Sequence, residues 1–275
     1  MIKSGSFLFY GDAGSGKTAM GVSAFWDYKK LKQVRDGRLI TFGREGNDAL
    51  DVPEELVKRF RSPTADPMKF LTDFNTYMAA LIVQLEKGQG PEVIVLDGWT
   101  EWNQALLYEY EQKGGDGDKW AKYEEAKDSF FAYQRALDPQ EFNIFVIATA
   151  RVDEKKKGIL SRRTGEVTGA DPDYMQGYKY IPAMVGWAKK NMAHYYDIVS
   201  YVEGEPSHVK DSKGNTRAAT LHQYNMIQTG DFLVKNRWEH KWLTTGQPDR
   251  LTNPLFDDMI GKLETANEKY AELAA

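Results

Sequence analysis

Short, continuous apolar runs alternate along the chain with longer stretches in which apolar residues recur at helical spacing. The runs are SFLFY at residues 6–10, RLITF at 38–42, EVIVLD at 92–97 and FNIFVIAT at 142–149. Runs without polar alternation are typical of strands buried on both faces, as in the centre of a parallel sheet. The pattern therefore predicts an α/β fold with a doubly wound, mostly parallel central sheet.

Helices are expected between these strands. One would follow the first strand, with an apolar face shared by Met20, Ala24, Tyr28 and Leu31. Asp51 as a cap and Pro53 in the first turn favour another over residues 51–60. Further helices are expected at residues 68–85, on both sides of the GGDGD turn at 114–118, and near 182–194.

The last third of the chain predicts strands that extend the sheet as an antiparallel edge. They are YDIVSYVE at residues 196–203, TRAATLHQY at 216–224 and a short strand ending near Val234. We expect a main domain at residues 1–243, followed at 244–275 by a linker and a C-terminal helix. That helix has an apolar face, which is expected to cover the core of its own domain and consists of Phe256, Met259, Ile260, Leu263, Ala266, Tyr270 and Leu273.

Composition narrows the chemistry that the chain can perform. The 275 residues contain no cysteine, which excludes disulfides, thiolate zinc sites and cysteine nucleophiles, and the four histidines lack a metal-ligand spacing. No apolar run approaches the roughly 20 residues of a membrane-spanning helix. A secretory signal is not recognisable at the first residues, so we expect a cytoplasmic protein.

The octet GDAGSGKT fits the phosphate-loop pattern G-x-x-x-x-G-K-[ST] and lies between a predicted strand and a predicted helix. Glycines in this pattern let successive backbone N–H groups face phosphate oxygens. Lys17 would supply a positive charge to the γ-phosphate, and Thr18 a hydroxyl to Mg²⁺. The predicted nucleotide-binding residues are Gly11, Asp12, Ala13, Gly14, Ser15, Gly16, Lys17, Thr18 and Ala19.

Asp97 ends the buried run VIVLD about 80 residues after the loop, where phosphate-loop enzymes hold magnesium. Hydrolysis also needs a carboxylate that activates water, and both Glu45 and Glu101 are candidates. Neither an N-K-x-D motif nor an L-S-G-G-Q signature is found, so ATP is favoured over GTP and a transporter ATPase is disfavoured.

Two further stretches resemble the RecA-like ATPases. LITFGREGNDAL resembles their strand and water-activating glutamate, which favours Glu45 over Glu101. KNR at residues 235–237 resembles the K-x-R motif of ATPases of the RecA, RadA, KaiC and DnaB type. There the Lys and Arg reach the γ-phosphate of a neighbouring subunit, which implies a homo-oligomeric ring or filament in which Lys235 and Arg237 act in trans.

The order of the motifs is similar to that of phage RecA-like ATPases, especially the Sak-type single-strand annealing recombinases. In such enzymes a polar sensor of the γ-phosphate often ends the strand VIATAR, which implies Thr149 or Arg151 here, although Arg departs from the usual residue and a surface role is an equal alternative. The loops leaving this region hold DNA in RecA-like proteins. The candidate phosphate contacts are Lys155, Lys156, Lys157, Arg162 and Arg163.

Tyr174, Tyr178 and Tyr180 follow this basic stretch and would offer rings for base stacking. The alternative is a solvated charged loop with tyrosines packed on the core. The leading hypothesis is an Mg²⁺-dependent ATPase that oligomerises and acts on single-stranded DNA in recombination or annealing. Its alternatives are an ATP-dependent switch that acts on a protein and a small-molecule phosphotransferase with Arg151, Arg162 and Arg163 as a lid.

Overall fold

The computed structural model describes most of the chain in twelve stretches. They are residues 2–27, 32–33, 35–42, 52–60, 66–113, 119–154, 159–160, 167–168, 178–184, 191–210, 215–228 and 231–274. Structural statements below concern these residues.

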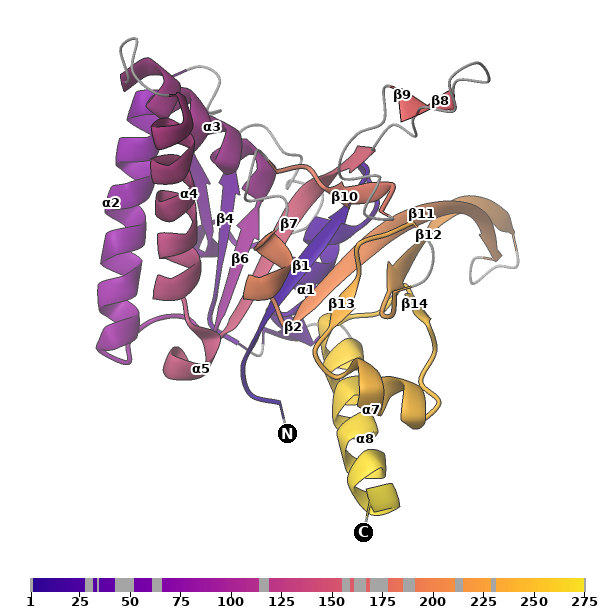
Figure 1. The fold of residues 1–275 in the computed structure, drawn as a ribbon. Helices are drawn as coiled ribbons and strands as arrows, with labels where there is room; N and C mark the ends of the chain where they lie inside the picture. The colour runs from indigo at the N-terminus through magenta and orange to yellow at the C-terminus, as the bar shows by residue number, and fades with distance from the viewer. Residues whose placement is uncertain are drawn as a thin grey trace.

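A ten-stranded sheet forms the centre of the molecule (Figure 1). Its strands are β1 (Gly5–Gly11), β4 (Gly37–Phe42), β5 (Val57–Phe60), β6 (Val93–Asp97), β7 (Phe145–Glu154), β10 (Tyr180–Pro182), β11 (Ile198–Lys210), β12 (Thr216–Asn225), β13 (Lys235–Asn236) and β14 (Arg250–Thr252). The main path runs β14-β12-β11-β1-β7-β6-β4-β5, with β10 paired to β7 and β13 to β11. Two small hairpins lie apart from it, β2 (Trp26–Asp27) with β3 (Lys32–Gln33) and β8 (Ile159–Leu160) with β9 (Val167–Thr168).

The strands from β11 to β5 are all parallel, whereas β12, β13 and β14 add antiparallel pairs at one edge. This arrangement confirms the predicted fold class: α/β, mostly parallel at the centre, with antiparallel edge strands. It differs in two respects. Strand β11, expected within the antiparallel edge, pairs in parallel with β1, and β10 pairs antiparallel with the central strand β7.

Helices cover both faces of the sheet. The helices are α1 (Lys17–Ser23), α2 (Pro67–Glu86), α3 (Trp99–Lys113), α4 (Lys119–Ala136), α5 (Pro139–Phe142), α7 (Glu239–Thr244) and α8 (Phe256–Ala274), with 3₁₀ turns at Glu54–Leu56 and Met192–Tyr195. Alternate residues of β1 point to opposite sides: Leu8 and Tyr10 pack with α2, α3 and α4, whereas Phe7 and Phe9 pack with α1 and α8. Each continuous apolar run therefore contributes alternate side chains to two hydrophobic cores, one on either face of the sheet.

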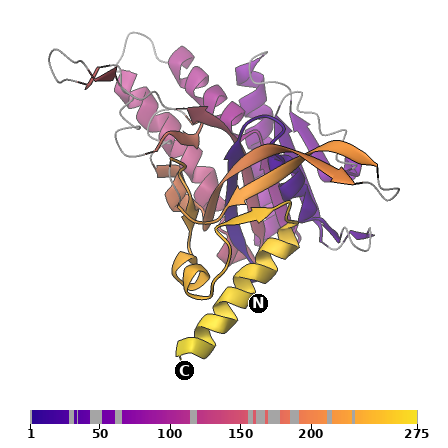
Figure 2. The same cartoon turned by 90° about the vertical axis from the view of Figure 1, so that its right-hand side faces the viewer.

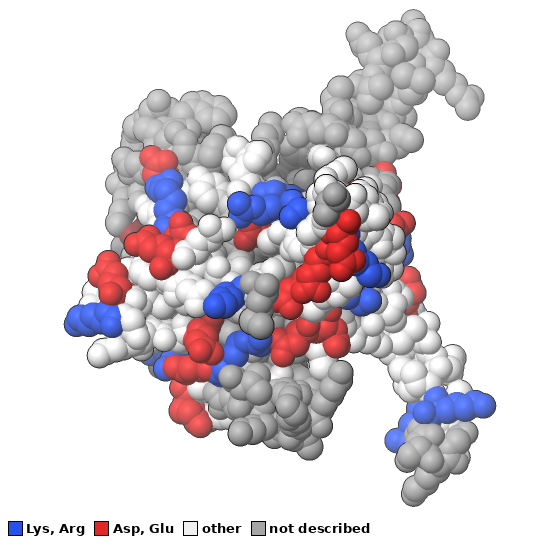
Figure 3. Space-filling view, turned by 90° about the horizontal axis from the view of Figure 1, so that it is seen from below, with Lys and Arg blue, Asp and Glu red and all other residues white. Residues whose placement is uncertain are grey.

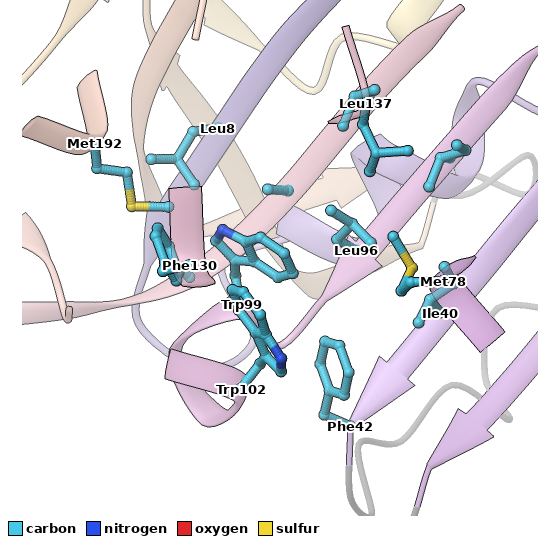
Figure 4. Packing of buried hydrophobic residues seen from close by; sticks show 14 of the residues in the cluster. Leu8, Ile40, Phe42, Met78, Leu96, Trp99, Trp102, Phe130, Leu137 and Met192 are labelled. Carbon is cyan, nitrogen blue, oxygen red and sulfur yellow. The ribbon is translucent and has the colours of Figure 1, made fainter. Parts of the chain in front are cut away.

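Aromatic rings dominate the core under α2, α3 and α4 (Figure 4). The indoles of Trp99 and Trp102 stack with centroids 4.3 Å apart, and Phe130 lies 4.9 Å from Trp102. Both tryptophans follow Asp97 directly at the start of α3, so burial of their rings anchors the helix that begins at the carboxyl end of β6.

One predicted helix is wrong over the described residues, and another is shorter than expected. Residues 57–60 form β5, paired with β4, because Phe60 packs on Phe42 and Phe74 instead of following a helical face. The first helix ends at Ser23, and Phe25 fills the space beside Gly37, where a Cβ would lie 2.4 Å from its ring. The helix expected near 182–194 is not tested, because residues 185–190 lie outside the described residues; of its flanks, 180–182 form β10 and 192–195 form a 3₁₀ turn.

The C-terminal segment packs onto the rest of the molecule. Residues 250–252, expected within a linker, form β14 and pair with β12. From Phe256 to Ala266 the apolar face of α8 covers the core beside β1, as predicted, and Phe256 lies edge-on to Phe7 at 5.1 Å. Leu273, expected on the same face, is instead exposed. Strand β14 and helix α8 are therefore continuous with the sheet and core formed by residues before 244.

Figure 2 shows the ends of β11 and β12 extending beyond the sheet as a two-stranded ribbon. Seen from the amino-terminal ends of the parallel strands, the described acidic and basic side chains are interspersed (Figure 3). Among the helices that the structure describes, none combines the length and the apolar character needed to span a bilayer.

Candidate nucleotide-binding site

The octet GDAGSGKT forms a turn between the end of β1 at Gly11 and the start of α1 at Lys17. Gly14 and Gly16 have φ angles of 75° and 94°, values that side-chain-bearing residues rarely adopt. A Cβ on Gly11 would lie 2.2 Å from the carbonyl oxygen of Val202, so this position also requires glycine. The spacing of the glycines therefore follows from the backbone path of the loop.

A cavity of about 570 Å³ opens above this loop at the carboxyl ends of the parallel strands. Most of the predicted site residues line it: Gly11, Asp12, Ala13, Gly14, Gly16, Lys17, Thr18, Ala19, Glu101, Thr149 and Arg151. Gly98, Ala150 and Val152 complete the lining. Ser15 and Asp97 lie behind this surface, almost completely buried.

Lys17 lies across the loop. Its Nζ donates hydrogen bonds to the carbonyl oxygens of Gly11 and Asp12, at 3.1 and 2.6 Å, and to Ser15 Oγ at 3.4 Å. Its positive charge also lowers the pKa of Asp97 and Glu101, although this is a minor influence on both. The ammonium group is thus held within the loop that would surround a phosphate chain.

Asp97 is the carboxylate at the centre of the site. Its Oδ1 accepts hydrogen bonds from Thr18 Oγ1 at 2.7 Å and from Thr149 Oγ1 at 2.6 Å. Its Oδ2 is buried and has no hydrogen-bond partner within the described part of the chain. Burial raises the pKa of Asp97, and the hydrogen bonds from Thr149 and Thr18 partly offset this rise. A buried carboxylate oxygen without a donor is the group that a cation would satisfy, so this site fits Mg²⁺.

Thr149, one of the two predicted sensors, is hydrogen-bonded to Asp97. Its hydroxyl donates to that carboxylate and accepts a hydrogen bond from the N–H of Gly98 at 3.1 Å. Strand β7 lies between β1 and β6, and this position at its carboxyl end brings Thr149 between the phosphate loop and Asp97. A change in the ligands of Asp97 would therefore reach β7 directly.

Glu101 and Arg151 form an ion pair at the cavity wall. The Glu101 side chain is 14% exposed and that of Arg151 is 66% exposed. Gly98, directly before α3, has a φ of 93°, and a Cβ there would lie 3.1 Å from Glu101 Oε2, so this position favours glycine. Burial raises the pKa of Glu101, and the neighbouring charge of Arg151 partly offsets the rise.

Lys235 and Arg237 lie toward the amino-terminal ends of the parallel strands, whereas their own phosphate loop follows the carboxyl end of β1, because β13 pairs with the first residues of β11. Lys235 Nζ donates to the carbonyl oxygens of Ala193 and Tyr196 at 2.8 and 2.7 Å. Arg237 forms an ion pair with Asp197 at 2.9 Å. Both side chains therefore have polar or ionic partners within their own chain, and none of these partners belongs to the phosphate loop.

Several predicted residues lie outside the described residues: Glu45, Lys155, Lys156, Lys157, Arg162, Arg163 and Tyr174. Tyr180 is described, and it stacks with Tyr201 and Phe232 at centroid distances of 5.6 and 5.4 Å. Lys179 lies 4.6 Å above the same ring. This tyrosine therefore packs within the protein, as in the alternative interpretation of the tyrosine segment.

Two residues that contact the loop were not predicted from the sequence. Tyr224 Oη donates a 2.8 Å hydrogen bond to the carbonyl oxygen of Gly16, and the ring of His222 lies against the same glycine. Both belong to β12, more than 200 residues after the loop. Nothing in a run such as TLHQYN indicates such a contact, because it depends on the register between β11 and β12.

No protein-family model matches the chain, and no curated protein matches it. Among solved structures, one similar chain is described as a prototypical ATPase from the type III secretion system of pathogenic bacteria. It shares 11% identity with a TM-score of 0.43, covering 72% of this chain and 52% of its own length. The present chain thus spans about half of that ATPase.

A second similar structure is the flagellar accessory protein FlaH from Methanocaldococcus jannaschii. It shares 7% identity with a TM-score of 0.41, and the match covers 92% of this chain and 87% of FlaH. Likenesses of this size do not identify a substrate or a partner. The function proposed below therefore rests on the geometry of the phosphate loop and of Asp97.

Proposed function

We propose that this protein is a Mg²⁺-dependent ATP hydrolase. The observation that carries the proposal is the 2.7 Å hydrogen bond between Thr18 and Asp97, which joins the phosphate loop to a buried carboxylate whose second oxygen has no donor among the described residues. Phosphate-loop enzymes use these residue types, in this arrangement, to hold a nucleotide and its metal ion. The absence of base-reading and transporter motifs favours ATP as the nucleotide.

Each residue has a defined task in this proposal. Backbone N–H groups of the loop bind the phosphate oxygens, and Lys17 stabilises negative charge that develops on the transferred phosphoryl group. Thr18 and Asp97 would hold Mg²⁺, which supplies charge neutralisation between the β- and γ-phosphates when it is bound. Thr149 keeps the Asp97 carboxylate oriented through its hydroxyl.

The attacking water requires a carboxylate as its acceptor. Glu101 lines the cavity, and its pairing with Arg151 holds it at the wall. Glu45 is favoured by the resemblance to RecA-like ATPases and follows β4, a strand that ends at the same edge of the sheet as β6. Both residues remain candidates for this step.

Glu45→Gln is expected to lower kcat by roughly 10²- to 10⁴-fold with little change in ATP affinity, since a general base acts on water and contributes little to nucleotide binding. Glu101→Gln should then have a much smaller effect on kcat. Single-turnover phosphate release with both variants checks the assignment. The opposite order of effects would transfer the role to Glu101.

We further propose that hydrolysis is coupled to assembly and to single-stranded DNA. This part is supported by the KNR segment, by its position away from the ATP site of its own chain, and by the basic stretch 151–163. Turnover measured with and without single-stranded DNA, over a range of protein concentrations, tests it. Turnover that depends on neither would contradict both couplings, and dependence on concentration alone would favour a switch that acts on a protein.

Arg237→Ala is expected to retain ATP binding but lose most turnover, because the guanidinium would act on the site of a neighbouring chain. Mixing this variant with Lys17→Ala protein should restore part of the activity. Asp197→Asn is the matched control, since it removes the ion pair of Arg237 and keeps the arginine. Equal loss in both variants, without recovery on mixing, would show that Arg237 only stabilises its own subunit.

A further inference from the structure

The phosphate loop packs against two cross-strand pairs of the β11–β12 ribbon, which are separated by the pair of Glu203 and Gln223. Val202 lies opposite Tyr224, and Gly204 lies opposite His222. The carbonyl of Val202 approaches Gly11, and a Cβ on Gly204 would lie 3.9 Å from the Cα of Ser15. The base of the ribbon therefore touches the loop at its first residue and again near its last glycine.

Tyr224 fixes the carbonyl group of Gly16. That oxygen accepts the hydrogen bond from Tyr224 Oη at 2.8 Å and the first helical bond, from the N–H of Met20, at 3.0 Å. The Tyr224 ring is 2% exposed and lies edge-on to Phe9 of β1, so its hydroxyl has little freedom to move. The peptide plane between Gly16 and Lys17 is held by a side chain from outside the loop.

His222 occupies the space beside the same glycine. A Cβ on Gly16 would lie 2.8 to 3.0 Å from the Cγ, Cδ2 and Nδ1 atoms of its ring. The backbone of His222 is held in turn, because its N–H donates to Asn253 Oδ1 at 2.7 Å and its carbonyl accepts from the N–H of Asn253 at 2.8 Å. Nδ1 is buried without a hydrogen-bond partner among the described residues, so no described polar bond at this nitrogen competes with the packing of the ring on Gly16.

We infer that His222 and Tyr224 are positioning residues for the phosphate loop. Gly16 adopts a left-handed conformation that an isolated chain would leave readily, and these two side chains hold it at the wall of the cavity that Gly16 and Lys17 line. The inference rests on the proposed function, because its consequence is a loop preorganised for phosphate. The inference also implies that the proposed ATP site depends on the β11–β12 ribbon, because both residues lie on β12.

The test uses the full chain and four variants. Tyr224→Phe removes only the hydroxyl, His222→Ala removes the ring, and His222→Gln keeps a flat polar group in its place. Gln223→Ala is the matched control on the same strand. Gln223 accepts a hydrogen bond from Thr252 and lies on the opposite face of the strand from His222 and Tyr224. Two quantities are measured: Mg²⁺-ADP and Mg²⁺-ATP affinity, and hydrogen–deuterium exchange of the amides at residues 15–18 without nucleotide.

Tyr224→Phe should lower the affinity for both nucleotides roughly fivefold, and His222→Ala about tenfold. In both variants, amide exchange at residues 15–18 should become faster. His222→Gln should recover part of the loss, and Gln223→Ala should match the wild type in both measurements. Unchanged exchange and affinity in Tyr224→Phe and His222→Ala would overturn the inference. If the wild type binds neither nucleotide, the proposed function fails, and the exchange rates still decide whether these residues hold the loop.

Discussion

Lys17→Ala is expected to lower kcat/KM for ATP by roughly 10²- to 10³-fold or more, because a preorganised cation facing the phosphoryl group is lost. In the structure the Lys17 ammonium group already lies over the loop, held by the carbonyl oxygens of Gly11 and Asp12. Little reorganisation is therefore needed when a phosphate chain replaces those acceptors. Steady-state phosphate release at several ATP concentrations measures the effect.

The control for this variant is Lys69→Ala, which removes a lysine of the same charge from the exposed face of α2. It should leave kcat/KM unchanged. Lys17→Ala should also keep a thermal midpoint close to that of the wild type, since its partners are carbonyl groups at the rim of an open cavity. Turnover by Lys17→Ala at the wild-type rate would show that the hydrolysis occurs elsewhere or comes from a contaminant.

Asp97→Asn is expected to lower Mg²⁺-dependent turnover by roughly 10²-fold or more and, at the same time, to raise the thermal midpoint of the nucleotide-free protein near neutral pH. The first effect follows from the loss of a metal-binding charge. The second follows from burial, which raises the pKa of Asp97 and makes its ionised form costly in the folded state.

The sign of the pH dependence is fixed by that raised pKa. A carboxyl whose pKa is higher in the folded state contributes stability that is fully present below its unfolded pKa of about 3.9 and is lost as pH rises through the folded value. The gain from Asp97→Asn should therefore appear above this window and vanish in acid. Thermal unfolding of both proteins across pH, with EDTA present, measures it. A destabilised Asp97→Asn protein at neutral pH would indicate a structural carboxylate instead.

The phosphate loop and Asp97 could be predicted because their signals are local. Strand, glycine spacing, lysine and threonine are contiguous in residues 6–18, and Asp97 ends an apolar run. In the structure, Thr18 of the loop donates a hydrogen bond to Asp97. The sequence spacing of these two residues does not predict that bond. Their separation by about 80 residues is bridged by the order of β1, β7 and β6 in the sheet.

The errors arose where tertiary pairing overrides local preference. Asp51 and Pro53 favour a helix start, yet Phe60 is buried against Phe42, and this contact requires a strand beside β4. Likewise the short strand at 250–252 has a linker-like composition and is specified by its pairing with β12. His222 and Tyr224 reach the loop only through the register of β11 and β12, which periodicity does not supply.

Lys235 and Arg237 illustrate a different limit. Their motif was recognised from three consecutive residues. In the structure, Lys235 is hydrogen-bonded to Ala193 and Tyr196, and Arg237 is ion-paired with Asp197, all within the same chain. Burial lowers the pKa of Lys235, and the nearby carboxylate of Asp197 partly offsets this. A role in a neighbouring site would require these side chains to exchange partners, and only an assembled protein can test that step.

The central claim is that ATP is hydrolysed at the loop joined to Asp97. Phosphate release from ATP by purified wild-type protein, measured with Mg²⁺ and again after EDTA, tests it most directly when Asp97→Asn is measured in parallel. We predict turnover that requires Mg²⁺ and is lost in Asp97→Asn. Turnover that survives EDTA, or that Asp97→Asn retains at the wild-type rate, would contradict the account.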